Sequence, residues 1–126
     1  MRDVVAVYGL GLVKNEADVL EQSIRHAATI CDRIFYMDNG STDDSWAIIE
    51  TLAQEMPGRV IAYERTFEPY VEGMRNRIQN ELSKELGPEA WWLKLDADEF
   101  LSVDPRPAIT AAMKEHRDGI RCWQVQ

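Results

Sequence analysis

Two acidic stretches follow apolar runs that are typical of buried strands. Asp96 and Asp98 come directly after the apolar residues 91–95, and Asp38 follows residues 33–37. If both runs are parallel strands, their carboxyl ends meet at one edge of the sheet, where ligands bind in such folds. Carboxylates two residues apart can point the same way, and their oxygens suit Mg²⁺ or Mn²⁺. The pattern predicts an anionic nucleotide ligand bridged by a divalent metal ion.

Polar residues elsewhere could complete this site. Asn15 and Glu16 end the first apolar run, and Arg75 lies at the start of an expected helix. Arginine matches the geometry of phosphate through paired donors. Arg77 and Arg65 are weaker candidates for the same role. The alternative interpretation at each arginine is an exposed, solvated surface, and for the acidic stretches it is an ordinary polar turn.

The apolar periodicity predicts alternating strands and helices that would hold these residues. Strands are expected at residues 4–12, 33–37, 60–63, 91–95 and 119–125, and helices at 18–29, 43–55, 73–86 and 105–116. Ser41 or Thr42 is the expected N-cap of the second helix. Such an order predicts a single domain over residues 1–126 with a three-layer α/β/α architecture and a mostly parallel sheet. Trp91 and Trp92 should face opposite sides of that sheet.

Composition narrows the possible partners and locations. The net charge of -8 leaves no basic surplus to neutralise the phosphates of nucleic acid. The longest apolar run, residues 4–13, is shorter than the roughly 20 residues of a membrane-spanning helix, and it lacks the layout of a signal peptide. We therefore expect a cytoplasmic protein without a membrane span. Cys31 and Cys122 are isolated, which favours two buried thiols over a zinc site.

With these motifs in order, the chain resembles the family 2 glycosyltransferases, which have the A-type nucleotide-diphospho-sugar transferase fold. The resemblance covers nearly the whole chain. Each motif is weak alone, but together they make the resemblance fairly specific. The matching elements are the strand leading into Asn15 and Glu16, the turn that begins at Asp38, Arg75 with Asn76, and Asp96 with Asp98 as the family's Asp-x-Asp.

The resemblance implies a role for each of these residues. Transfer of a sugar from a nucleotide-diphospho-sugar, usually a UDP-sugar, to an acceptor would proceed with Mn²⁺ or Mg²⁺ and with inversion of the anomeric centre. Asn15 and Glu16 would line the nucleoside pocket, Asp38 would contact the base, Arg75 would lie near ribose or diphosphate, Asp96 would contact the donor, and Asp98 would ligate the metal, with Asp96 beside it. The family's general base is expected beyond Gln126.

Other interpretations stay open at this point. The family's domain normally continues for about as many residues again, so we expect a truncated, donor-binding portion that is incomplete at the C-terminus. One alternative is a nucleotidyltransferase, although Gly9 and Gly11 lie too far inside the first expected strand to form a phosphate-binding loop. Another is an inactive nucleotide-binding or interaction domain. A homodimer through an exposed edge strand is a further expectation.

Overall fold

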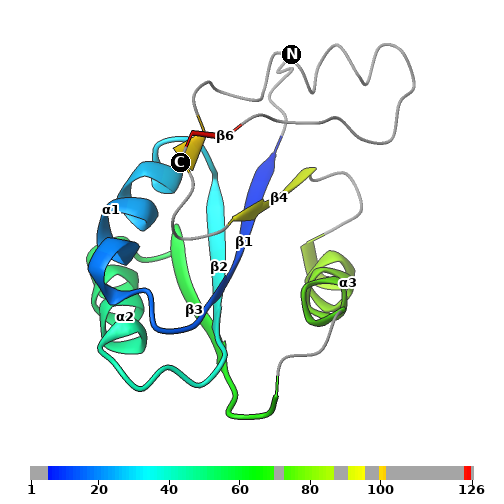
Figure 1. The fold of residues 1–126 in the computed structure, drawn as a ribbon. Helices are drawn as coiled ribbons and strands as arrows, with labels where there is room; N and C mark the ends of the chain where they lie inside the picture. The colour runs from blue at the N-terminus through cyan, green and yellow to red at the C-terminus, as the bar shows by residue number, and fades with distance from the viewer. Residues whose placement is uncertain (1–5, 70–72, 87–90, 96–99, 102–123, 126) are drawn as a thin grey trace.

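The structure is a computed structural model that describes residues 6–69, 73–86, 91–95, 100–101 and 124–125. Strands and helices alternate through most of this range (Figure 1). The strands are β1 (Val7–Val13), β2 (Arg33–Asp38), β3 (Val60–Arg65), β4 (Trp91–Leu95), β5 (Phe100–Leu101) and β6 (Gln124–Val125), and the helices are α1 (Ala17–Ala28), α2 (Ser45–Glu55) and α3 (Met74–Leu86).

The main sheet has four parallel strands in the order β3-β2-β1-β4. β1 is therefore central, and its apolar sequence suits a strand that is covered on both faces. The two short strands β5 and β6 pair antiparallel in a separate sheet. The predicted mostly parallel sheet is confirmed.

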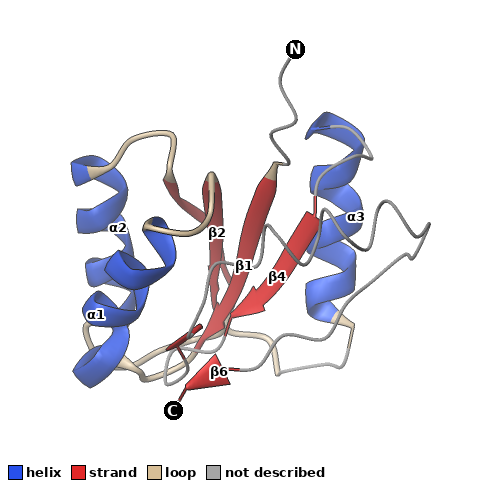
Figure 2. Ribbon diagram, turned by 90° about the horizontal axis from the view of Figure 1, so that it is seen from above, coloured by secondary structure: helices blue, strands red, loops and turns tan. Residues whose placement is uncertain are grey.

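Helices cover both faces of the main sheet, which gives the predicted three layers. α1 and α2 lie on one face and α3 on the other (Figure 2). Two apolar clusters fill the interfaces, one between the sheet and the α1–α2 pair and one between the sheet and α3. Trp91 packs against the first cluster and Trp92 against the second, so the predicted alternation is confirmed. Cys31 is buried, as expected, whereas Cys122 lies outside the described residues.

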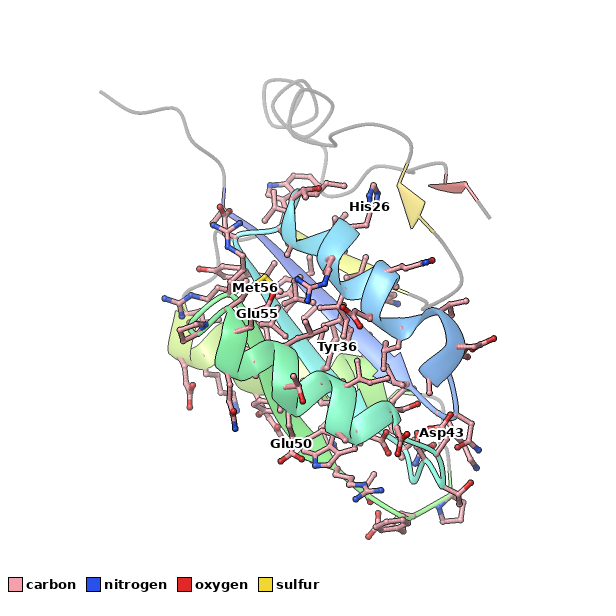
Figure 3. The ribbon with its side chains drawn as sticks, turned by 90° about the vertical axis from the view of Figure 1, so that its left-hand side faces the viewer. His26, Tyr36, Asp43, Glu50, Glu55 and Met56 are labelled. Atoms are coloured by element: carbon pink, nitrogen blue, oxygen red, sulfur yellow. The ribbon has the colours of Figure 1, made fainter. Side chains whose placement is uncertain are left out.

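Two glycines in β1 let neighbouring side chains approach the central strand. A Cβ on Gly9 would lie 2.7 Å from Cδ1 of Leu95, and a Cβ on Gly11 would lie 2.5 Å from Cε1 of Tyr36. Tyr36 itself lies between the sheet and the α1–α2 layer (Figure 3). The two glycines therefore serve packing inside a strand, a position that does not fit a phosphate-binding loop.

Several predicted boundaries need correction. β1 runs to Val13 and β3 to Arg65, which is further than the sequence suggested. α2 begins at Ser45, with Asp44 as its N-cap and no side-chain capping hydrogen bond, so the expected cap at Ser41 or Thr42 is wrong. The expected helix 105–116 lies outside the described residues, as does the expected strand 119–125 except for β6. Among the helices that the structure describes, none is long and apolar enough to cross a membrane.

Candidate functional site

The carboxyl ends of the parallel strands bring three polar loops together. Val13 pairs with Asp38, and Asp38 pairs with Arg65, so the ends of β1, β2 and β3 lie in one row. The loops that follow them gather at the lower edge of the sheet in Figure 1. On the other side of β1, Leu95 at the end of β4 pairs with Gly11. This edge is where ligands bind in parallel α/β sheets.

Asp38 is the buried acid of this edge. Its side chain has no exposed surface, and Oδ1 accepts a hydrogen bond of 2.7 Å from the Ser41 backbone N–H. Arg65 places its Nε 3.7 Å from the same oxygen. Oδ2 is buried and has no hydrogen-bond partner among the residues that the structure describes. A buried carboxylate oxygen without a donor is costly, so it calls for a functional explanation such as a ligand.

Asn15 holds the loop after β2 in place. Its backbone has φ 53°, in the left-handed region that asparagine tolerates better than most residues. Its N–H donates to Ser41 Oγ at 2.8 Å. Its side-chain oxygen accepts hydrogen bonds from the backbone N–H groups of Thr42 at 2.8 Å and Asp43 at 3.3 Å. The amide oxygen of Asn15 is therefore occupied by protein donors.

Glu16 and Asp43 add two further links between the loops after β1 and β2. The Glu16 N–H donates to Ser45 Oγ at 2.9 Å, and Glu16 is also the N-cap residue of α1. Asp43 accepts hydrogen bonds from the backbone N–H groups of Ala17 at 3.2 Å and Ser45 at 2.9 Å. Figure 3 shows Asp43 at the end of the molecule where α1 begins. The side chains of Ser41 and Asp43 are thus engaged across the loops, which explains why Ser41 does not cap α2.

The electrostatics of Asp43 follow from these contacts. Hydrogen bonding to Ser45 is the main cause that lowers the pKa of Asp43 below its ordinary value, with smaller help from the Ala17 N–H. Partial desolvation acts in the opposite direction and is the weaker effect. Asp43 is therefore a charged acceptor that ties the start of α1 to the start of α2.

The loop after β3 lies next to the loop after β2 at this edge of the sheet. The Thr66 N–H donates to the Asp38 carbonyl at 2.9 Å, and the Asn39 side chain donates to the Glu68 carbonyl at 2.8 Å. The loop presents Phe67, a residue that is 72% exposed. Gly40, with φ 80°, lets this ring pack close, because a Cβ there would lie 3.2 Å from Phe67 Cδ1.

Several predicted site residues cannot be placed against this cluster. Asp96 and Asp98 lie outside the described residues, although Leu95, which precedes them, ends β4 at the same edge. Arg75 is in the first turn of α3, and its side chain is outside the described part. Arg77 instead pairs with carboxylates on the surface, Glu64 at 2.8 Å and Glu81 at 3.0 Å. Within the described residues, no three His, Cys, Asp or Glu side chains form a metal-binding group.

A hollow lies at the opposite edge of the sheet, away from the carboxyl ends of the strands. Its volume is about 460 Å³, and it lies where α1 and α2 end. Its arginines are already engaged: Arg25 binds Glu55 and Glu21, and Arg59 donates to the Ala28 carbonyl. The carboxyl edge is the better candidate site, because the buried Oδ2 of Asp38 has no hydrogen-bond partner among the described residues. The lining residues of the hollow are Arg25, Ala28, Thr29, Met56, Pro57 and Arg59.

Comparison with known proteins agrees with this geometry. Residues 12–125 match the model of the family described as glycosyl transferase family 2. The chain belongs to glycosyl transferase family 2. A family relative described as an uncharacterized glycosyltransferase, from Rickettsia felis, is 28% identical over 116 residues, which cover 91% of this chain and 37% of the relative.

The fold of this family 2 chain is similar to that of a solved glycosyltransferase. The mannosyltransferase PcManGT from Pyrobaculum calidifontis, in complex with GDP-Man and Mn²⁺, superposes with a TM-score of 0.61 at 18% identity. The similarity covers 81% of this chain and 30% of that one. It confirms the α/β nucleotide-diphospho-sugar transferase-like fold. The chain thus spans about a third of the length of both proteins.

The prediction that Asp38 is an acid at a strand end is confirmed, because Asp38 ends β2. The expectation that Arg65 is a weaker candidate for binding a diphosphate stays a prediction, and the structure places Arg65 beside Asp38. The contact between Arg65 and Asp38 could be predicted from the rule that residues ending two neighbouring parallel strands lie side by side. That rule requires knowledge of the strand order, which the sequence does not state.

Proposed function

We propose that this chain binds the nucleotide-diphospho-sugar donor of a metal-assisted glycosyltransferase. The observation that carries the proposal is Asp38, whose buried Oδ2 lacks a donor at the edge where such folds bind ligands. A nucleobase N–H is a donor of the required kind. Membership of glycosyl transferase family 2 supports the same conclusion, and the similar mannosyltransferase holds GDP-Man.

Each predicted residue has a distinct role in this proposal. Asp38 contacts the base, and Glu16 and Asn15 border the nucleoside. Asn15 acts mainly by holding the Asp38 loop, because its side-chain oxygen already binds Thr42. Arg75 contributes charge near the ribose or diphosphate, since it lies in the first turn of α3.

The proposed metal ligands are Asp98 and Asp96. Asp96 and Asp98 directly follow Leu95, the last residue of β4, and their oxygens suit Mn²⁺ or Mg²⁺. When bound, such an ion supplies Lewis-acid stabilisation of the charge on the departing nucleoside diphosphate.

Donor binding is the part of the reaction that this chain accounts for. It spans 37% of the Rickettsia relative and 30% of the mannosyltransferase. The acceptor pocket and the general base of an inverting transfer are proposed to belong to sequence that these longer proteins have in addition. Membership of glycosyl transferase family 2 favours a glycosyltransferase over a nucleotidyltransferase, as does the position of Gly9 and Gly11 inside β1.

Calorimetric titration with UDP and with GDP, with and without Mn²⁺, tests the proposal. We expect Mn²⁺ to strengthen binding, Asp98→Asn to abolish that gain, and Asp38→Ala to weaken binding in both conditions. Asp44→Asn is the matched control, because Asp44 lies in the same loop and is exposed, with no side-chain capping bond. The proposal would be overturned if neither UDP nor GDP bound to the chain. It would also be overturned if Asp38→Ala bound these nucleotides as tightly as wild type does.

A nucleotide-binding domain without turnover is the second candidate. Assays of hydrolysis and transfer of a UDP-sugar or GDP-sugar by the chain itself distinguish this candidate from an active glycosyltransferase. Nucleotide binding without either reaction would support this second candidate for the chain taken alone.

A further inference from the structure

β3 contains a bulge close to its carboxyl end. In the register with β2, Ala62 lies opposite Tyr36. The next pair is Glu64 with Met37, so Tyr63 is an extra residue with no opposite residue in β2. Bulges of this kind are rare between parallel strands, and next to functional sites they turn side chains in new directions. The direction of the residues that follow Tyr63 is therefore informative.

The bulge places Glu64 on the face of the sheet that α3 covers. Side chains alternate along a regular strand, and Ala62 packs against the apolar cluster on the α1–α2 face, whereas Tyr63 packs against the cluster on the α3 face. Continued alternation would turn Glu64 toward α1 and α2. Because of the bulge, Glu64 instead shares the face of Met37, which belongs to the α3 cluster. Two successive residues of β3 thus face α3.

Both of these residues bind polar side chains of α3. Nη2 of Arg77 donates to Oε2 of Glu64 at 2.8 Å, and Nη1 lies 3.5 Å from Oε1 of the same carboxylate. Arg77 also donates to Glu81 at 3.0 Å, and the Tyr63 hydroxyl donates to Glu81 at 3.0 Å. An arginine that faces both oxygens of one carboxylate fixes orientation as well as distance. The bulge is therefore connected to α3 by directional contacts.

These contacts act on the start of α3. The Arg77 N–H donates to the Gly73 carbonyl at 2.8 Å, which closes the first turn of the helix. Arg75 lies in this same turn, two residues before Arg77. Met74 and Ile78 bury one side of α3 against the sheet, but burial of apolar surface is non-directional. The contacts with β3 supply the direction that burial does not.

We infer that Glu64 and Arg77 are positioning residues, which hold the first turn of α3 so that the charge of Arg75 meets the diphosphate of the donor. An exposed ion pair contributes little to stability, so stability alone is a poor reason for a bulge that turns Glu64 toward Arg77. The inference rests on the proposed function, because it assumes that Arg75 lies near the diphosphate. It deepens that function by assigning a use to the bulge.

Removal of the Glu64 charge tests the inference, because two explanations predict opposite results. Calorimetric titration with UDP in the presence of Mn²⁺, repeated in competition with uridine, gives two affinities whose ratio reports on the diphosphate. GDP and guanosine replace them if GDP binds more tightly. Glu64→Gln removes a negative charge near an anionic ligand, so charge alone would raise the ratio. Positioning predicts that Glu64→Gln and Arg77→Met each lower it about threefold, because the first turn of α3 loses its anchor.

Variants at Arg75 and Arg25 separate positioning from a general loss of stability. Arg75→Met should lower the ratio at least about tenfold, since a charge-assisted contact with the diphosphate is lost. Adding Glu64→Gln to Arg75→Met should change the ratio no further, because the pair acts through Arg75. Arg25→Met is the matched control, since Arg25 also binds two carboxylates, Glu21 and Glu55, but at the opposite edge of the sheet. Its ratio should equal that of wild type.

Failure of the inference is distinguishable from failure of the proposed function. The inference is overturned if the ratio for Glu64→Gln equals or exceeds that of wild type, if Arg25→Met lowers the ratio equally, or if Arg75→Met leaves it unchanged. It is also overturned if Glu64→Gln still lowers the ratio without Arg75. Donor binding stands in all these cases, because wild type binds the nucleotide. Glu64→Gln decides the question if Arg77→Met does not fold, as judged by circular dichroism. Absence of nucleotide binding by wild type overturns the proposed function itself, and the inference with it.

Discussion

Asn15 and Thr42 join the loops that follow β1 and β2: the Asn15 side-chain oxygen accepts a hydrogen bond of 2.8 Å from the Thr42 backbone N–H. The Asn15 N–H also donates to Ser41 Oγ at 2.8 Å, and the Ser41 N–H donates to Asp38 Oδ1 at 2.7 Å. Asn15 is therefore linked to the buried carboxylate of Asp38 through a single intervening residue. The position of that carboxylate depends on both loops, and not on β2 alone.

Variants at Asn15 separate its hydrogen bonds from its backbone conformation. Asn15→Gly tolerates the left-handed backbone but removes the acceptor, so we expect a loss of about 1 kcal/mol of unfolding free energy. Asn15→Ala also places a Cβ at φ 53°, and this should cost about a further 1 kcal/mol. Urea denaturation followed by circular dichroism measures both losses.

Asn15→Asp is the control for this series, since it keeps an acceptor oxygen and tolerates the same backbone. Its stability should be close to that of wild type. A glycine variant as stable as wild type would show that the contacts of the Asn15 side-chain oxygen with Thr42 and Asp43 contribute nothing. Equal stability of the glycine and alanine variants would contradict the backbone argument.

The stability that Asp43 contributes by linking the two loops should depend on pH. Its pKa is lowered from the ordinary 3.8 by hydrogen bonding, first to Ser45 and then to the Ala17 N–H. A carboxylate with a lowered pKa in the folded state contributes stability above its unfolded value, and that contribution is lost as the pH falls through the folded value. Asp43→Ala should therefore be less stable than wild type at neutral pH, and the difference should shrink below about pH 4.

Urea denaturation of both proteins across this pH range provides the measurement. Asp44→Ala serves as a neighbouring control, because its side chain makes no capping bond. A stability difference for Asp43→Ala that stays constant from neutral to acidic pH would contradict the assignment.

The apolar pattern predicted the order of β1 to β4 and α1 to α3 because each of these strands and helices buries its own side chains. Trp91 and Trp92 illustrate this, since period-two alternation assigned them to opposite faces and the two apolar clusters confirm it. The position of Asp38 at a strand end followed from the same reasoning. These features depend on local sequence.

The cap of α2 and the partner of Arg65 depend on contacts between distant segments. Ser41 has the right chemistry for an N-cap, but its hydroxyl accepts the Asn15 N–H instead. Arg65 meets Asp38 only because β3 lies next to β2 in the sheet. Local sequence propensity encodes neither of these two contacts. They could not be predicted without the order of the strands.

Gly11 and Tyr36 should be energetically coupled. A Cβ at Gly11 would lie 2.5 Å from Cε1 of Tyr36, too close for an unaltered core. We expect Gly11→Ala to lower the unfolding free energy by about 2 kcal/mol, as overpacking does elsewhere. In a Tyr36→Leu background the same change should cost about 1 kcal/mol less, because the ring is gone. Equal costs in the two backgrounds, measured by urea denaturation, would exclude a clash with this ring.

The Tyr36 hydroxyl and Asp38 Oδ2 are both buried without a hydrogen-bond partner in the described part of the chain. Different predictions follow for the two groups. Asp38 is at the ligand-binding edge, whereas Tyr36 lies within the core beneath α1 and α2, where burial raises the pKa of its hydroxyl. No ligand is expected there. Tyr36→Phe should therefore match wild type or gain up to about 1 kcal/mol of stability, because an unpaired buried hydroxyl is removed.

Tyr63→Phe is the matched control for Tyr36→Phe. The Tyr63 hydroxyl donates to Glu81 at 3.0 Å, so its removal should lower stability slightly while leaving the ring in place. Thermal or urea unfolding should thus show a lowered stability for Tyr63→Phe and an unchanged or raised stability for Tyr36→Phe. If Tyr36→Phe were destabilised by more than about 1 kcal/mol, the hydroxyl would have to bind a buried water or another group, because only a satisfied hydroxyl loses stability on removal.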